Sequence, residues 1–205
     1  MPKTLSETEV AEFRTRLCEA AARMFVEKGP EAVTMRTLAK ELGCSAMTPY
    51  RYFKDKQAIL AAVRTKGFEE LADTLESVRA VSGDLAASAT VLGGNYWAFA
   101  SARPHVYRMM FDVGSEEGDS PAFLKAKDRV CASLMAAIDR AGGPSSPKGD
   151  EAAICQSVMS ALHGATMLKL SGLMDKNTCP AALASRLIVA LVSASAERKP
   201  NARKG

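Results

Sequence analysis

The spacing of apolar residues near the start of the chain predicts a long first helix. Apolar side chains recur every three or four positions from about Glu7 to Lys28, which places them on one face of an α-helix. Thr4 or Ser6 can cap the beginning of this helix, and Gly29-Pro30 ends it. The residues on the apolar face are Val10, Phe13, Leu17, Ala20, Ala21, Met24 and Phe25.

Two short helices and one longer helix are predicted in the next part of the chain. A short helix is predicted after Thr34, with Leu38, Ala39 and Leu42 inward and Gly43 at its end. Ser45 is then expected to cap a second short helix over residues 46–53. A longer helix is predicted from Lys54, and its apolar positions are Ile59, Leu60, Val63, Phe68, Leu71 and Leu75.

Helix-breaking residues divide the remainder of the chain. A helix is expected to open after residues 81–84 and to break at Arg103-Pro104, and a short helix is expected from His105 to Phe111. Further helices are predicted from Pro121, over 151–170 and over 180–197, with loops at 113–120 and 141–150 and a polar tail at 198–205. Because no segment alternates apolar and polar residues as a strand does, the predicted fold class is all-α.

The composition is that of an ordinary globular protein, with 47% apolar and 24% charged residues. No window holds the 18 or more uninterrupted apolar residues of a membrane span, so no membrane partner is expected. The first residues lack the apolar segment of a signal peptide, and a cytoplasmic location is therefore expected.

The positive charge is concentrated in one part of the chain. The net charge is +4 overall, which permits a nucleic-acid partner without requiring one. From Thr34 to Lys56 five basic residues stand against two acidic ones, so this window alone carries +3.

Cysteine and histidine do not form a pattern that indicates a metal site. The five cysteines are scattered and include no Cys-x-x-Cys pair, so neither a disulfide framework nor a zinc site is predicted. Buried thiols are expected, although a redox-sensing role for one of them stays open. The two histidines, His105 and His163, are too few and too isolated to hold a metal. No metal and no cofactor are predicted.

The two short helices around Gly43 form a candidate helix-turn-helix. Gly43 can supply the left-handed backbone of the turn, and Ala39 is small where the helices cross. The second helix then presents polar and aromatic side chains outward, as a helix that reads a DNA major groove does. Thr34 begins the first helix, where a hydroxyl and backbone amides can bind phosphate. Lys56 begins the next helix against the preference of the helix dipole, which indicates an anionic partner.

Three runs of residues around this motif resemble the TetR family of regulators. They are AARMFVEKG at 21–29, TMRTLA at 34–39 and TPYRYFKDK at 48–56. The similarity covers roughly residues 10 to 60 and includes the helix before the motif. It implies an all-helical homodimer whose first three helices bind DNA, while the remaining helices bind a small ligand and the second subunit.

The resemblance assigns DNA-binding roles by position. Two departures from the family pattern make the operator sequence harder to infer: Pro49 replaces a more usual leucine, and Ala46-Met47 replaces a lysine-glycine pair. The predicted DNA-binding residues are Thr34, Arg36, Ser45, Met47, Thr48, Tyr50, Arg51, Tyr52 and Lys56.

The second half resembles a branch of the family known for a Trp-His-Gly signature. The similar runs are GNYWAFA at 94–100, PHVYRMMF at 104–111 and Leu162-His163-Gly164, where Leu162 departs from the tryptophan. Aromatic and methionine side chains at helical spacing are ordinary core residues or the lining of an apolar sensing pocket, and both interpretations stay open. The predicted ligand-binding residues are Tyr96, Phe99, Met109, Met110, Phe111 and His163.

These patterns favour a ligand-responsive repressor that binds a palindromic double-stranded DNA operator as a homodimer. The predicted domains are a DNA-binding domain at 1–55, with its motif at about 35–54, and a regulatory domain at 56–197. The expected effector is a small apolar molecule. No catalytic residues are predicted, because the sequence has no phosphate loop, nucleophile elbow or Cys/His pair. An enzyme or carrier with a vestigial DNA-binding region, and an architectural DNA-binding protein without a ligand, are the alternatives.

Overall fold

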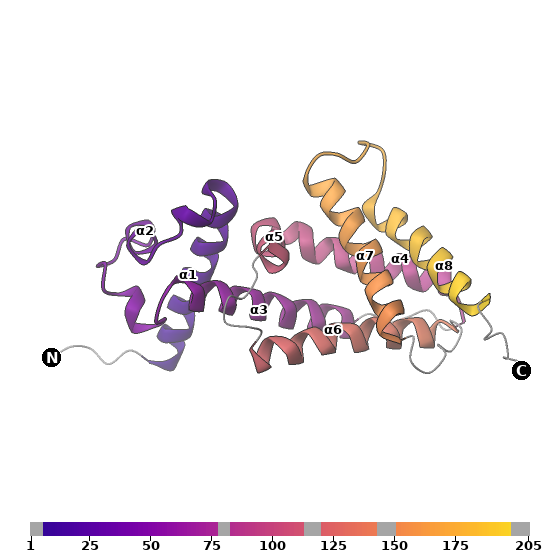
Figure 1. Cartoon of the computed structure of the whole chain (residues 1–205), viewed down its shortest axis with the longest axis horizontal. Coiled ribbons are helices and arrows are strands. Elements are labelled where there is room, and N and C mark those ends of the chain that lie inside the picture. Colours follow the sequence, from indigo (N-terminus) through magenta and orange to yellow (C-terminus); the bar gives the residue numbers. More distant parts are fainter. Residues whose placement is uncertain (1–5, 78–82, 113–119, 143–150, 198–205) are drawn as a thin grey trace, which may run out of the picture. The chain divides into compact units, whose positions relative to one another are not determined.

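The computed structural model describes residues 6–77, 83–112, 120–142 and 151–197, and every regular element in these ranges is a helix. Figure 1 shows the elements in chain order. They are α1 (Glu7–Lys28), η1 (Pro30–Ala32), α2 (Met35–Glu41), η2 (Pro49–Arg51), α3 (Lys56–Glu76), α4 (Leu85–Ala102), α5 (Pro104–Asp112), α6 (Pro121–Arg140), α7 (Glu151–Leu170) and α8 (Pro180–Glu197). The predicted all-α fold class is confirmed.

The helix ends follow the capping residues in the sequence. Ser6 caps α1 through a reciprocal pair of hydrogen bonds with Glu9, and Gly29 ends the helix at a φ of 83°. Side chains of Asp55, Asp84 and Ser120 accept backbone N–H groups at the starts of α3, α4 and α6. The predicted spans of α1, α7 and α8 are confirmed. The predicted loops at 113–120 and 141–150 and the tail at 198–205 lie largely or wholly outside the described residues.

The chain forms two compact units. The first contains Met1–Phe68 and Arg103–Leu124, and the second contains Glu69–Ala102 and Lys125–Gly205. Both units therefore combine segments that are distant in the sequence. The predicted boundary between the DNA-binding domain and the regulatory domain, after residue 55, stays a prediction.

The first unit is built on an apolar core between α1, α2, the start of α3 and α5. Leu17, Leu38, Ile59 and Met109 are fully buried in it. An aromatic group extends this core, because Phe68 packs against the rings of Phe111 and Phe123. Burial of large apolar side chains contributes roughly 1.5–3 kcal/mol each, so these residues supply much of the unit's stability.

The second unit packs α4, α7 and α8 side by side (Figure 1). A Cβ atom added to Gly93 would lie 2.8 Å from the carbonyl oxygen of Ala181, so α4 and α8 approach closely only because Gly93 has no side chain. The hydroxyls of Thr90 and Ser185 lie 3.0 Å apart across the same contact. None of the described helices is long and apolar enough to span a bilayer.

Cys131 of α6 and Cys155 of α7 form a disulfide, with their Cα atoms 5.8 Å apart. This corrects the expectation that the cysteines are thiols without partners. The sequence pattern missed the pair because the two residues are 24 positions apart and meet only when α6 packs near α7. Cys18, Cys44 and Cys179 are free.

Candidate nucleic-acid interface

Helix α2 begins at a reciprocal cap. The Thr34 hydroxyl accepts the backbone N–H of Thr37, and the Thr37 hydroxyl accepts the backbone N–H of Thr34. Thr37 also donates to the carbonyl of Ala32, which ties the cap to the preceding turn. Thr34 and Arg36 stay exposed at this end of the helix, next to its unpaired N–H groups. A cationic side chain and a helix N-terminus at one place suit a phosphate oxygen.

The turn after α2 has the backbone that its sequence predicts. Gly43 has a φ of 65°, in the left-handed region, and its backbone leaves the helix there. The N–H of Cys44 donates to the carbonyl of Ala39, which closes the end of α2. Ala39 itself is buried, as expected for a small residue where helices cross.

The predicted recognition helix over residues 46–53 is replaced by a turn and the short 3-10 helix η2. In an α-helix, the N–H of residue 49 would donate to the carbonyl of Ser45, but Pro49 has no N–H. The Ser45 carbonyl accepts instead from Thr48, and the Thr48 carbonyl accepts from Arg51. Pro49 therefore explains why this segment is tighter and shorter than predicted.

Ser45 was expected to cap this helix through a backbone N–H, and that expectation is wrong. Its hydroxyl lies 2.9 Å from the hydroxyl of Thr48, and no side-chain cap is formed at η2. Ser45 is exposed and Thr48 is half-buried.

We call residues 45–53 the recognition segment. Two of its side chains, Pro49 and Phe53, are buried and anchor it. The guanidinium of Arg14 lies 4.0 Å from the centre of the Phe53 ring, and Arg14 also donates to the carbonyl of Tyr52. The Tyr52 ring packs on Phe13 with ring centres 4.6 Å apart. Helix α1 therefore holds the recognition segment from behind.

The remaining side chains of the recognition segment include three that face solvent. Met47 is 69% exposed and Tyr50 is 51% exposed. Arg51 is exposed beside them. A surface with an exposed tyrosine, methionine and arginine can donate hydrogen bonds and make apolar contacts with base edges.

Lys56 is the first residue of α3 and is half-buried. The neighbouring Asp55 accepts the backbone N–H of Ala58 at 2.8 Å and so caps the helix. Of the two acidic residues in the 34–56 window, Glu41 lies 3.3 Å from Arg23, while Asp55 lies 4.0 Å from Lys54. Exposed pairs of this kind contribute little energy, so the positive charge of the window stays available to an anion.

All nine predicted DNA-binding residues lie in the first unit, on α2 and its cap, the recognition segment and the start of α3. Their contacts with DNA stay a prediction. No sequence pattern indicated that Phe13 and Arg14 of α1 support the recognition segment. The spacing of Phe13 marked it as core, but its pairing with Tyr52 depends on the tertiary fold.

The predicted ligand-binding residues fall into two groups. Met109, Met110 and Phe111 lie on α5 in the first unit, where Met109 and Met110 are buried. Met110 packs so closely on Gly67 that a Cβ atom there would lie 2.5 Å from the Met110 sulfur. The Phe111 ring packs against the Phe68 ring, so Met110 and Phe111 both contact residues of α3.

The other group lies in the second unit. Tyr96 is buried on α4, and its hydroxyl is 3.5 Å from the sulfur of Met159 on α7. Phe99 on α4 and His163 on α7 are both half-buried. The role of both groups in ligand binding stays a prediction.

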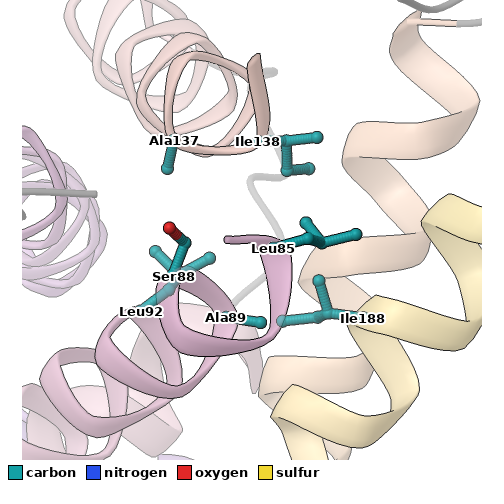
Figure 2. A pocket seen from close by; sticks show the side chains of 7 residues that line it. All are labelled: Leu85, Ser88, Ala89, Leu92, Ala137, Ile138 and Ile188. Atoms are coloured by element: carbon teal, nitrogen blue, oxygen red, sulfur yellow. The ribbon is translucent and has the colours of Figure 1, made fainter. Parts of the chain in front are cut away.

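A small cavity in the second unit has a volume of about 10 Å³ (Figure 2). Ser88 is the one polar residue among those that line it, and none of the six predicted ligand-binding residues is among them. The volume corresponds to about one water molecule, which is too small for an effector. The lining residues are Leu85, Ser88, Ala89, Leu92, Ala137, Ile138 and Ile188.

Arg129 of α6 forms the clearest ion-pair cluster in the described part of the second unit. Its guanidinium donates to Asp73 at 2.7 Å and to both oxygens of Glu76 at 2.7 and 3.0 Å. These hydrogen bonds, first with Glu76 and then with Asp73, raise the pKa of Arg129 above its ordinary value. The cluster connects α6 with the second half of α3.

The comparisons with known proteins agree with this geometry. Residues 17–63 match the family described as "Bacterial regulatory proteins, tetR family", and residues 89–191 match the family described as "Tetracyclin repressor-like, C-terminal domain". In the described residues every regular element is a helix, and the order α2, glycine turn and η2 near the N-terminus is that of a helix-turn-helix with a short second helix. The chain belongs to the TetR family of transcriptional regulators. The family resemblance is thereby confirmed, whereas the Trp-His-Gly branch stays a prediction.

Relatives and solved structures add detail. An uncharacterised HTH-type transcriptional regulator of Mycobacterium tuberculosis is 28% identical over 144 residues, which cover 64% of this chain and 64% of that protein. An HTH-type transcriptional regulator of Staphylococcus aureus is 46% identical over 48 residues, 23% of this chain and 26% of that protein. The chain therefore spans less than two thirds of these relatives.

Similar folds are found in solved TetR-family structures. One from Marinobacter aquaeolei VT8 has a TM-score of 0.70 at 18% identity, covering 91% of this chain and 98% of that one. One from Streptomyces coelicolor has a TM-score of 0.68 at 23% identity, covering 92% and 84%. At this identity the likeness shows the fold.

Proposed function

We propose that this regulator is a repressor that binds a palindromic DNA operator as a homodimer and releases it when a small apolar molecule binds its C-terminal domain. The observation that carries the proposal is the recognition segment, in which buried Pro49 and Phe53 anchor a backbone that exposes other side chains. Exposed side chains on a fixed backbone can read base edges, and those available here are Met47, Tyr50 and Arg51.

Phosphate contacts complete the proposed interface. Thr34 and Arg36 lie at the start of α2, and Lys56 lies at the start of α3. Contacts with phosphate position a protein on the duplex and supply affinity, while contacts with base edges select the sequence.

A homodimer would present two recognition segments to DNA. Recognition elements about 34–36 Å apart fit two half-sites one helical turn apart. Apolar residues at helical spacing on α7 and α8 are candidates for the contact between subunits, but Val158 and Leu162 are buried within the chain. Leu187 and Leu191 of α8 are 42% and 39% exposed and are the better candidates for a subunit contact in a four-helix bundle.

The remaining parts of the proposal follow from this role. A repressor works where the DNA is, so we assign the protein to the cytoplasm. We assign it no catalytic activity. An effector that favours one conformation of the dimer would weaken operator binding by changing the spacing of the two recognition segments. Tyr96, Phe99, Met109, Met110, Phe111 and His163 remain our candidates for effector contacts.

Operator binding by variants tests the proposal. Duplexes enriched from a random pool by the full-length protein identify the operator, and fluorescence anisotropy then gives affinities. Tyr50→Ala is expected to cost about 1–3 kcal/mol of binding free energy, because it removes a side chain that touches base edges. Lys56→Ala is expected to weaken binding to all duplexes, because it removes a cation that touches phosphate.

The matched control is Lys66→Ala, which removes the same charge from an exposed position on the same helix. It should bind the operator like the original protein. Circular dichroism checks that each variant keeps its helices. Unchanged affinity in both Tyr50→Ala and Lys56→Ala contradicts the assignment of the interface.

A further inference from the structure

Cys131 and Cys155 are the one cysteine pair that the described residues bring together. Cys131 lies on α6 and Cys155 on α7, and their Cα separation of 5.8 Å is within the range that a disulfide spans without backbone movement. Cys131 is half-buried, whereas Cys155 is buried. A reagent from solution can therefore reach Cys131 first.

The proposed function makes this pair unusual. A repressor acts in a compartment where low-molecular-weight thiols keep cysteines reduced, and disulfides that form there are usually transient and redox-sensing. We propose that Cys131 and Cys155 are a redox modification site: a dithiol that a low-molecular-weight disulfide oxidises to the crosslink between α6 and α7, with a change in operator affinity. The change in operator affinity rests on the proposed function.

The oxidation proceeds by two thiol–disulfide exchanges. The Cys131 thiolate attacks one sulfur of the small disulfide, which forms a mixed disulfide and releases one small thiolate. The Cys155 thiolate then attacks the Cys131 sulfur, which forms the protein disulfide and releases the second thiolate. The two protein thiols give up two electrons and two protons, and the small disulfide takes them up as two small thiols.

The neighbours of the pair connect it to the helix that begins at Lys56. Two residues before Cys131, Arg129 forms ion pairs with Asp73 and Glu76 of α3. The crosslink holds α6 against α7, while the contact between the rings of Phe123 and Phe68 and the ion pairs of Arg129 join α6 to the continuous helix whose first residue is Lys56. A change in the freedom of α6 can therefore bias the conformations of α3. Coupling between sites in proteins typically changes affinity by about 5–150-fold.

The other cysteines do not offer an equivalent site. Burial raises the pKa of Cys18 to about 11, so little reactive thiolate forms there at neutral pH. Cys44 and Cys179 are free and lie in different units. Cys44→Ser/Cys179→Ser is therefore a control that keeps the Cys131–Cys155 pair.

The test uses the full-length protein in buffers of reduced and oxidised glutathione at a series of ratios. After acid quenching and alkylation, peptide mapping by mass spectrometry locates the disulfide, and anisotropy gives operator affinity in each buffer. We expect the 131–155 crosslink in oxidising buffer, its reduction in reducing buffer, and an affinity change of about fivefold or more between the two. The control variant is expected to respond in the same way, whereas Cys131→Ser and Cys155→Ser are expected to have one affinity in all buffers.

The possible results test the modification site and its effect on operator affinity separately. Absence of the 131–155 crosslink in the original protein at the most oxidising ratio overturns the modification site, whatever the variants do. A mapped crosslink with an affinity change below about fivefold overturns the regulatory role. Failure to bind any duplex in any buffer overturns the proposed function and the regulation together, while the mapping still decides the site.

Discussion

The recognition segment and the contact between α4 and α8 differ in what they expose. In the recognition segment, Pro49 and Phe53 are buried while Met47 and Tyr50 face solvent. At the α4–α8 contact, the backbones approach closely at Gly93, where a Cβ atom would lie 2.8 Å from the carbonyl oxygen of Ala181. A segment held by a few anchors can vary its exposed residues without loss of the fold. A contact that depends on small residues has little such freedom.

The largest expected effect comes from removing an anchor of the recognition segment. Phe53→Ala is expected to lower the free energy of unfolding by about 3–5 kcal/mol, because it leaves a cavity beneath the segment and removes the ring under Arg14. Met47→Ala, at an exposed position of the same segment, is expected to change it by less than about 0.5 kcal/mol. Urea unfolding followed by circular dichroism measures both. Similar destabilisation of the two variants would contradict the division into anchors and exposed residues.

A smaller effect is expected at the α4–α8 contact. Gly93→Ala is expected to lower the free energy of unfolding by about 1–3 kcal/mol, because the new methyl group meets the backbone of Ala181. Gly94→Ala is the matched control, since a Cβ atom there has no neighbour within 4 Å. An alanine in a helix is favoured over glycine by roughly 0.5–1 kcal/mol, so this variant should be slightly stabilised. Thermal unfolding that ranks Gly93→Ala at or above Gly94→Ala would show that the helices are not in close contact.

The smallest effect concerns Cys18, which lies on α1 and is partly buried against the core of the first unit. Burial raises the pKa of this thiol to about 11, so the folded protein favours the protonated form. Its contribution to stability is complete below the ordinary cysteine pKa and is lost as the pH rises toward 11, with no change expected at neutral pH. At a pH of about 8, iodoacetamide should alkylate exposed Cys179 much faster than Cys18. Equal rates in a mass-spectrometric time course would refute the raised pKa of Cys18.

The sequence predicted the helix boundaries best where glycine or proline residues mark the ends of the helices. Gly29-Pro30 and Pro180 end or begin helices at the expected positions because their backbone restrictions act locally. Pro49 shows the limit of this reasoning. Its missing N–H was a local signal against a helix over 46–53, but Ser45 as a capping residue favoured one, and the structure has η2 instead.

Features that depend on tertiary packing could not be predicted. Spacing alone does not distinguish a buried core residue from a pocket residue, so Met109 and Met110 were compatible with both interpretations before their burial was known. The Cys131–Cys155 pair joins residues far apart in sequence, as the Arg129 cluster does. The exposure of Tyr50 was predicted from the polar face of the motif. The support of the recognition segment by Phe13 and Arg14 of α1 could be seen only in the folded structure.

The central claim is that the recognition segment and the start of α3 bind DNA, and the salt dependence of operator binding tests it most directly. Removing one cation that touches phosphate reduces the slope of log affinity against log salt concentration by about one unit. We therefore expect Lys56→Ala to reduce the slope by about one unit, while Lys66→Ala, which removes the same charge from the same helix, leaves it unchanged. Equal slopes for the original protein and both variants would contradict the claim that Lys56 contacts DNA.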